Sequence, residues 1–261
     1  MTTGMSHTPI DTSRPHSARV YDWLLGGKDN YPVDQAVAEQ LPAEAKIGAH
    51  QNRAFMSRAT AWLAGEGVGQ FLDIGTGIPT APNLHQTAQE INPAARVVYC
   101  DNDPIVLRHA EALLISRPEG ATDYVPADVR EPEGIVEAAR RILDFDRPVA
   151  VSLLGLLHFL PDEDDPYAIV RTLVSTLAPG SYVVLSQGAS DVNPERGEQG
   201  TAEYRKGGIR LALRTRDEFA RFLDGLDIVE PGLVTAPEWF RGTPAPQPEA
   251  SGLYVAVARV P

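Results

Sequence analysis

Short apolar runs alternate with helical stretches along most of the chain. Seven runs are rich in residues that suit buried strands: 71–74, 96–100, one that ends within 124–130, 148–154, 182–186, 227–234 and 253–260. Strands that alternate with helices predict a parallel sheet with helices on both faces. The pattern therefore predicts an α/β, Rossmann-like fold with a seven-stranded, mostly parallel sheet and one reversed strand.

The first 68 residues carry a helical pattern instead. Residues 15–25 predict a helix that Gly26-Gly27 ends, Asp34 can cap a second short helix, and 43–64 predict a long one. We expect residues 14–68 to form a helical cover over the strand ends. Residues 1–13 are polar and are expected to be a disordered arm, and residues 69–261 are expected to form the Rossmann-like domain.

Three later segments have distinct signatures. Residues 187–208 lack a clear periodicity and predict a long loop. Thr215 and Glu218 form a capping box that predicts a helix start before 219–223. The proline-bearing stretch 236–250 predicts a connecting loop.

Composition narrows the class of protein. A net charge of −12 argues against general binding to nucleic acid, which needs a basic face. No apolar stretch approaches the length of a membrane span, and residues 1–13 lack the apolar core of a signal peptide. Cys100 is the single cysteine, so no disulfide can form within the chain. We therefore expect a protein of the reducing cytoplasm, with no membrane partner and an open oligomeric state.

The turn after the first strand carries the most specific signal. Asp73 ends the strand, and Gly75-Thr76-Gly77 lets backbone approach a ligand closely. An acid there suits an ammonium group better than a phosphate. A dinucleotide site would need a third glycine where Thr80 stands, and Pro79 removes an N–H donor. A tight turn with no ligand is the other alternative.

Acids also follow the next two strands. Asp101 is placed to accept hydrogen bonds from both hydroxyls of a ribose, while Asp103 can cap the helix that starts after Pro104. Asp128 follows the third strand, where it can bind a ligand or be an ordinary loop acid. Because the carboxyl ends of parallel strands meet at one edge, we expect these acids to converge on one crevice.

Two levels of resemblance follow from these motifs. Asp-x-Gly-x-Gly at 73–77 resembles the first motif of class I S-adenosylmethionine (SAM) methyltransferases. Nearly the whole chain resembles the actinobacterial S-adenosyl methyltransferase family, formerly catalogued as a domain of unknown function. The matching stretches are 17–31, 52–55, 70–80, 97–104 and 157–165.

The resemblance implies SAM as cofactor and S-adenosylhomocysteine (SAH) as product. It implies that Asp128 takes the adenine amino group and that Val129 packs on the ring. The cofactor-binding residues that it implies are Asp73, Gly75, Thr76, Gly77, Asp101, Asn102, Asp128, Val129 and Leu154.

Residues for the acceptor are harder to assign. The signature stretch offers a substrate-binding or lid segment with Arg19, Tyr21, Gly26, Gly27, Lys28, Asn30 and Tyr31. Candidates for a catalytic base are Tyr21, Tyr31 and His158. Aromatic candidates for the acceptor pocket are Tyr21, Trp23, Tyr31, Phe159, Tyr204 and Trp239.

The sequence lacks the motifs of several specific methyl-transfer reactions. No Asn/Asp-Pro-Pro-aromatic sequence follows the fourth strand, which weakens amino-methylation of nucleic acid bases, and no Pro-Cys nucleophile is present. The acidic run 162–165 is typical of the first turn of a helix rather than a metal site, so no metal is expected. We expect a SAM-dependent methyltransferase with a small-molecule acceptor. The alternatives are a non-catalytic SAM-binding or sensor protein and, less favoured, an NAD(P)-binding Rossmann protein.

Overall fold

A computed structural model describes residues 11–113, 115–240 and 251–261. Its centre is an eight-stranded sheet in the order β3-β2-β1-β4-β5-β8-β6, with β7 also pairing with β8. The strands are β1 (Gln70–Ile74), β2 (Arg96–Asp101), β3 (Ala121–Pro126), β4 (Ala150–Leu153), β5 (Tyr182–Gly188), β6 (Asp227–Ile228), β7 (Val234–Thr235) and β8 (Leu253–Arg259). Strands β1 to β5 are parallel and β8 runs antiparallel to β5, so the α/β fold with one reversed strand is confirmed.

The predicted strand at 227–234 is divided into two short strands. Both β6 and β7 pair with β8, and Val229 N–H still donates to the Val257 carbonyl oxygen of β8 (2.9 Å), but residues 230–233 do not pair with it. Pro231 lies in this gap and has no N–H to give to a neighbouring strand, so pairing is interrupted there.

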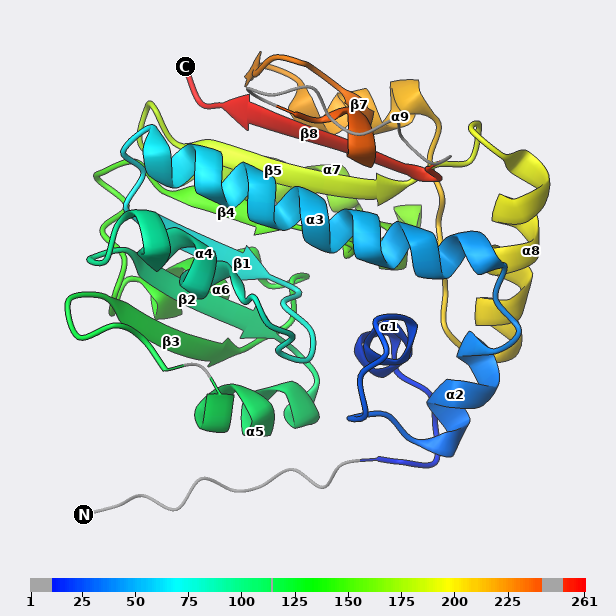
Figure 1. Cartoon of the computed structure of the whole chain (residues 1–261). Coiled ribbons are helices and arrows are strands. Elements are labelled where there is room, and N and C mark those ends of the chain that lie inside the picture. Colours follow the sequence, from blue (N-terminus) through cyan, green and yellow to red (C-terminus); the bar gives the residue numbers. More distant parts are fainter. Residues whose placement is uncertain (1–10, 114, 241–250) are drawn as a thin grey trace.

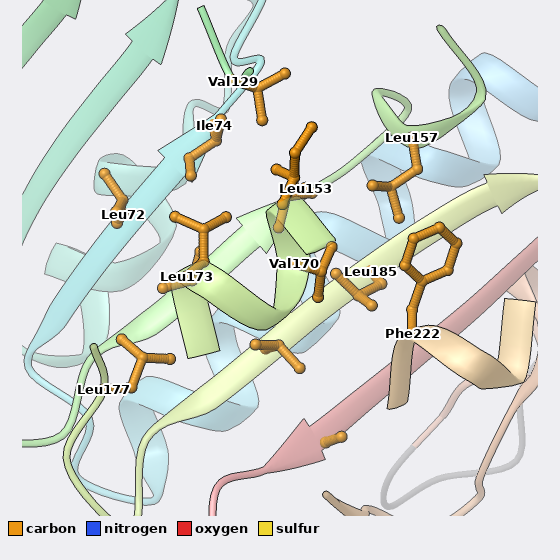
Figure 2. Packing of buried hydrophobic residues seen from close by; sticks show 14 of the residues in the cluster. Leu72, Ile74, Val129, Leu153, Leu157, Val170, Leu173, Leu177, Leu185 and Phe222 are labelled. Atoms are coloured by element: carbon orange, nitrogen blue, oxygen red, sulfur yellow. The ribbon is translucent and has the colours of Figure 1, made fainter. Parts of the chain in front are cut away.

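Alternate residues of the central strands face two separate cores. Leu72 and Ile74 of β1 pack in a core with α6 (Pro132–Ala139), α7 (Pro166–Ser175) and α9 (Arg216–Ala220). Figure 2 shows this core around Leu153, Leu173 and Phe222. Phe71 faces the opposite side, where it packs with α3 (Ala43–Gly65) and α4 (Leu84–Ile91). The period of two in each strand thus confirms helices on both faces.

A smaller third core lies beyond the carboxyl ends of the parallel strands. It joins α1 (Ser17–Leu24) and α2 (Pro32–Ala38) to α8 (Pro194–Lys206) through Val20, Val37 and Tyr204. In Figure 1 these helices stand at the tips of the β1, β4 and β5 arrows, while α3 runs along the sheet. The expected cover at 14–68 is therefore divided: α1 and α2 lie at the strand ends and α3 covers a face.

Helix α8 corrects the expected loop at 187–208. Its sequence is almost wholly polar and only Tyr204 is buried, so no apolar period marks it. Local chemistry explains its start, because the Asn193 side chain accepts a hydrogen bond from Arg196 N (3.3 Å) and Pro194 occupies the first turn. The capping box of Thr215 and Glu218 is confirmed at the start of α9.

The remaining short elements complete the chain. They are α5 (Pro104–Leu113) and the 3₁₀ helices η1 (Leu157–Phe159), η2 (Asp162–Asp164), η3 (Arg221–Leu223) and η4 (Ala236–Glu238). Residues 162–164 of the acidic run form η2, and Asp165 caps α7 by accepting from Ala168 N (3.0 Å). Residues 1–10 of the expected arm and 241–250 of the expected connecting loop lie outside the described residues. No helix in the described ranges is long and apolar enough to cross a membrane.

Candidate active site

The glycine turn after β1 is tied to the end of β2. The N–H groups of Gly75 and Thr76 donate to the Cys100 carbonyl oxygen (2.8 and 3.1 Å), and Gly77 N–H donates to Asp101 Oδ2 (2.8 Å). Gly75 has φ 73°, and a Cβ there would lie 2.8 Å from the Leu156 side chain. Only glycine combines a positive φ with the absence of a side chain, so the backbone of the turn can lie close to the loop after β4.

This geometry does not form a phosphate cradle. The three N–H groups of the turn all donate to protein acceptors, and Pro79 has none. The following helix, α4, begins only at Leu84, so its positive N-terminal end is not at the turn. The backbone donors that hold the pyrophosphate of a dinucleotide are thus committed elsewhere, which argues against an NAD(P) site.

Asp73 and Asp101 place two buried carboxylates beside the turn. Asp73 Oδ1 accepts a hydrogen bond from Ser152 Oγ (2.7 Å), and Asp101 Oδ1 accepts from Asp103 N (3.0 Å). Burial raises the pKa of both carboxyls, although these hydrogen bonds oppose the shift. A carboxylate has about four acceptor positions, so each retains capacity for ligand donors. The site is suited to cationic and hydroxyl groups.

Asp128 differs from Asp73 and Asp101 in the direction of its pKa shift, because its carboxylate is hydrogen-bonded to a cationic and an amide side chain. Its carboxylate accepts from Asn102 Nδ2 (3.0 Å) and Arg130 N (3.0 Å). Burial alone would raise the pKa of Asp128, but these hydrogen bonds and the Arg130 charge outweigh it and lower the pKa. Arg130 also pairs with Asp164 at 2.8 Å. The acid is therefore held ionised, as a fixed acceptor at the end of β3.

A cavity of about 340 Å³ joins these groups at the carboxyl edge of the sheet. Its size is that of a small-molecule site. It is lined by every residue expected to bind cofactor: Asp73, Gly75, Thr76, Gly77, Asp101, Asn102, Asp128, Val129 and Leu154. The opposite wall comes from 15–18 and Tyr21, from Asn52, Arg53 and Met56 of α3, and from 208–210.

A protein-family model described as S-adenosyl methyltransferase matches residues 3–261. The chain belongs to the S-adenosyl methyltransferase family. It is therefore a member of a family of enzymes that use SAM as methyl donor.

Solved structures agree with this assignment. A DUF574 family protein from Streptomyces avermitilis is 44% identical, with a TM-score of 0.92 over 97% of this chain and 100% of that one. A putative methyltransferase from Thermobifida fusca is 38% identical, with a TM-score of 0.86 over 96% of each chain. Magnesium protoporphyrin IX methyltransferase from Synechocystis, solved with bound SAH, is 15% identical with a TM-score of 0.54 over 93% of each chain, and this likeness shows the fold alone. A search of curated proteins found no match to this chain.

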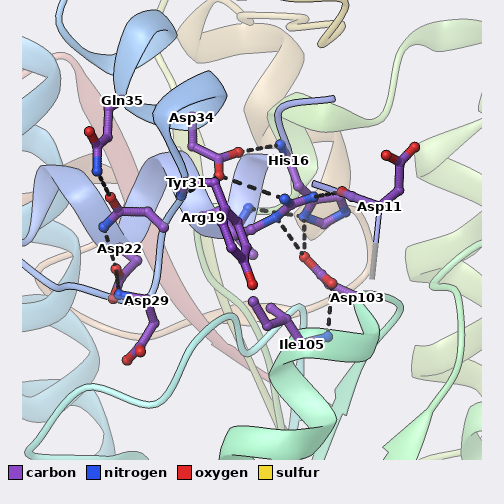
Figure 3. Close-up of polar contacts among 12 residues, drawn as sticks. Asp11, His16, Arg19, Asp22, Asp29, Tyr31, Asp34, Gln35, Asp103 and Ile105 are labelled. Atoms are coloured by element: carbon purple, nitrogen blue, oxygen red, sulfur yellow. Dashed lines mark hydrogen bonds and ion pairs between the residues drawn. The ribbon is translucent and has the colours of Figure 1, made fainter. Parts of the chain in front are cut away.

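Arg19 does not line the cavity of this methyltransferase but lies buried behind it. Its Nη1 is 3.6 Å from Asp34 Oδ2, and its Nε is 3.4 Å from Asp103 Oδ2 (Figure 3). Asp34 also accepts from His16 N and Tyr31 N, both at 2.9 Å. This cluster fastens α1 and α2 to the loop after β2, which makes Arg19 a structural link to the site.

The loop after α1 is also placed away from the cavity. The buried Asp22 carboxylate accepts from Asp29 N (2.9 Å) and Asn30 Nδ2 (2.8 Å), and it lies against Gly27. Gly26, Gly27, Lys28, Asn30 and Tyr31 do not line the cavity, and Tyr31 packs instead with Ile78 and Ile105. Of the expected lid, the structure brings only Tyr21 to the cavity wall.

Two of the base candidates, His158 and Tyr21, already have hydrogen-bond partners within the protein. His158 lies outside the cavity lining, and its Nδ1 accepts from Gly188 N (3.3 Å). Burial, helped by the Arg214 charge, lowers the pKa of His158 to about 4, so the ring is neutral at physiological pH. The Tyr21 hydroxyl donates to the Ala49 carbonyl oxygen (3.0 Å) and accepts from Asn52 Nδ2 (3.0 Å), and burial raises the pKa of Tyr21.

Among the aromatic candidates, Tyr21 and Phe159 line the cavity. Tyr204 is buried against Phe159, with ring centroids 5.7 Å apart. Trp239 is fully buried against Phe55 in the sheet core, so its expected place in the acceptor pocket is wrong. Trp23 and Tyr31 lie outside the lining.

Sequence reasoning missed several wall residues. Asn52 and Arg53 belong to the 52–55 stretch that resembles the family, which was the available signal for them. Residues 208–210 follow the unpredicted helix α8, so no periodicity could place them. Ser17 and Ala18 belong to the 17–31 stretch, which carried the same signal, whereas His16 is the cap of the first helix, a position that indicates only a helix start.

Proposed function

We propose that this chain transfers a methyl group from SAM to a small molecule bound in the cavity at the carboxyl edge of the sheet. The observation that carries the proposal is the meeting of Asp73, Asp101 and Asp128 in one cavity whose turn offers no free phosphate donors. When bound, SAM supplies an electrophilic methyl group on a sulfonium.

The two buried acids have separate tasks. Asp101 accepts hydrogen bonds from the ribose hydroxyls with the lone pairs that Gly77 N and Asp103 N leave free. Asp73 faces the amino acid end and holds its ammonium group. An ammonium there offsets the burial that raises the pKa of Asp73.

Arg53 and Asp128 complete the cofactor site. Arg53 lines the cavity while one of its terminal nitrogens donates to the carbonyl oxygens of Thr80 and Pro82. Its remaining N–H groups suit the methionine carboxylate. Asp128 is held as a fixed acceptor and suits the adenine amino group, while Val129 offers an apolar surface to the ring.

Apolar groups shape the space for the acceptor. Leu154, Leu156 and Phe159 from the β4 end and Met56 from α3 line the cavity. Such a lining excludes water and holds donor and nucleophile in line. The start of α1 and residues 52–56 of α3 contribute the wall on this side. Residues 14–68 thus act as the cover of an active site formed mainly by 69–261, although most of α3 packs on the sheet.

The remaining assignments follow from charge and burial. The net charge of −12 supports a small-molecule acceptor rather than a nucleic acid. The single Cys100 is buried, and burial raises the pKa of its thiol to about 12, so it is unreactive. A lone unreactive thiol fits the cytoplasm.

Calorimetric titration tests the proposed function. The protein should bind SAM and SAH and should not bind NADH under the same conditions. Binding of NADH without SAM or SAH would mean that the glycine turn has been misassigned.

A further inference from the structure

We propose that Asn52 binds the nucleophilic nitrogen of the methyl acceptor, and that the acceptor is an amine. This inference rests on the proposed function. Residues 153–157 at the end of β4 are Leu-Leu-Gly-Leu-Leu and offer no polar side chain. A group that positions a nucleophile beside this strand end must therefore come from another element.

Asn52 occupies that place. It projects from α3, lines the cavity and is only 5% exposed. A Cβ built on Gly155 would lie 3.0 Å from Asn52 Nδ2 and 4.0 Å from Tyr21 Cε2. Because Gly155 has no side chain, the Asn52 amide from α3 can lie next to the end of β4.

The hydrogen bonds fix which way the amide points. Asn52 Nδ2 donates to the Tyr21 hydroxyl (3.0 Å), which donates in turn to the Ala49 carbonyl oxygen (3.0 Å). The NH₂ group is therefore turned toward Tyr21. Asn52 Oδ1 is buried and has no hydrogen-bond partner within the described part of the chain. A buried acceptor without a donor is costly, so a donor from a bound molecule would satisfy it.

The chemistry of the cavity favours an amine as that donor. Groups that can take a proton lie on the side that the proposed function gives to the cofactor. Asp73 and Asp101 face its ammonium and ribose, and Asp128 faces its adenine. His16 pairs with Asp103 at 3.0 Å beside the ribose acid, and the Tyr21 hydroxyl donates to the Ala49 carbonyl oxygen. An alcohol needs a base before it can attack well, whereas a neutral amine attacks with its own lone pair.

The step balances without a protein base. The amine lone pair forms the new N–CH₃ bond while the S–CH₃ bond breaks and its electron pair stays on sulfur. The product is an ammonium ion, which loses its extra proton to water. During attack, Asn52 Oδ1 accepts a hydrogen bond from one amine N–H and so directs the lone pair toward the methyl carbon.

Sinefungin provides a probe that needs no knowledge of the acceptor. It resembles SAH but carries an amino group at the position of the transferred methyl. This position adjoins the attacking nitrogen, so an oxygen that receives the acceptor N–H is also within reach of the sinefungin amino group. The ratio of the SAH and sinefungin dissociation constants isolates the contact of that amino group, because the two ligands otherwise differ only by the carbon that replaces the sulfur. We expect Asn52→Leu to reduce the preference for sinefungin by about tenfold or more, since a hydrogen bond to a charged donor is lost.

Two variants control the measurement. Asn52→Asp keeps an oxygen acceptor and should retain the preference for sinefungin. Gln51→Leu removes a neighbouring side chain of α3 whose Oε1 is also buried without a hydrogen-bond partner among the described residues, but which does not line the cavity. It should leave the ratio unchanged.

The outcomes separate the inference from the proposed function. An equal loss of both ligands in Asn52→Leu would place Asn52 on the shared amino acid end, and an unchanged ratio would make its role structural. Either result overturns the inference while SAM binding stands. If the wild-type protein binds neither ligand, the proposed function fails and the inference fails with it.

Discussion

Arg19 Nε lies 3.4 Å from Asp103 Oδ2, and both side chains are buried, at 5% and 3% exposure. The pair links the first helix to the loop after β2. Asp103 N donates in turn to Asp101 Oδ1 (3.0 Å), the carboxylate that we assign to the ribose. The helix that forms one wall of the cavity is thus connected directly to the cofactor-binding side.

Removing this arginine should destabilise the fold. Arg19→Met removes the guanidinium from beside the buried Asp34 and Asp103, and removing one partner of a buried ion pair typically costs about 3–5 kcal/mol. Urea unfolding measures the change. Arg205→Met on the exposed face of α8 is the matched control and should change the free energy of unfolding by less than about 0.5 kcal/mol. Equal stability of the two variants would show that the buried pair is not required.

Replacing the ribose acid should weaken cofactor binding. Asp101→Ala removes charge-assisted hydrogen bonds worth about 1.5–3 kcal/mol, so calorimetry should show SAH affinity falling about 10- to 100-fold. Asp123→Ala is the control, because Asp123 pairs with Arg141 at 3.0 Å on the surface and does not line the cavity. Unchanged SAH affinity in a folded Asp101→Ala protein would remove this residue from the site.

Replacing a glycine should have opposite effects on stability in the turn after β1 and in a helix. Gly75→Ala places a Cβ 2.8 Å from Leu156 on a backbone with φ 73°, and the left-handed conformation alone costs about 1–2 kcal/mol. Gly134→Ala lies in helix α6 with open space around it, and should stabilise the protein by about 0.5–1 kcal/mol. Thermal unfolding of both variants checks the pair. Similar effects on the two melting temperatures would contradict the close approach of the turn to Leu156.

Acid stability should report the burial of His158. Its folded pKa is about 4, below its ordinary value of 6.5, so the unfolded chain binds a proton first as the pH falls. His158 therefore costs no stability above pH 6.5, and its destabilising effect grows as the pH falls from 6.5 to about 4, to roughly 2–3 kcal/mol. Urea unfolding of His158→Asn across this range should show a shallower loss of stability than the wild type. Parallel pH profiles would mean that the ring titrates normally.

Hydrogen exchange should distinguish the two parts of the first helical segment. SAH should protect amides in 16–21, which line the cavity or neighbour it, together with those near Asp101 and Asp128. The loop at 26–31 is held by Asp22 and should change less. If the loop gains the larger protection, it closes over the ligand as a lid, in the way the sequence suggested.

The sequence predicted the parallel part of the fold because its signals are local. Each strand at the centre of the sheet is an apolar run, and each acid at a strand end follows directly in sequence, so Asp73, Asp101 and Asp128 could be placed together. Helix α8 could not be predicted in this way, because Tyr204 is its only buried residue. Its formation depends on a cap and on packing against α1 and α2.

The acceptor side was less predictable because it depends on tertiary packing. Asn52 reaches Gly155 from a helix about a hundred residues earlier, and no spacing rule links the two. The dependence on tertiary packing also explains why the expected place of Trp239 in the acceptor pocket was wrong, since its ring packs in the core beside Phe55. The role expected for Arg19 changed for a related reason, since its two acidic partners come from separate elements.

A crystal structure with bound SAH tests the central claim most directly. We predict ribose oxygens within hydrogen-bond distance of the Asp101 carboxylate and the ammonium nitrogen next to Asp73, with the sulfur facing the space between Leu154, Asn52 and Phe159. SAH bound elsewhere on the chain, or bound here without contact to Asp101 and Asp73, would contradict the account.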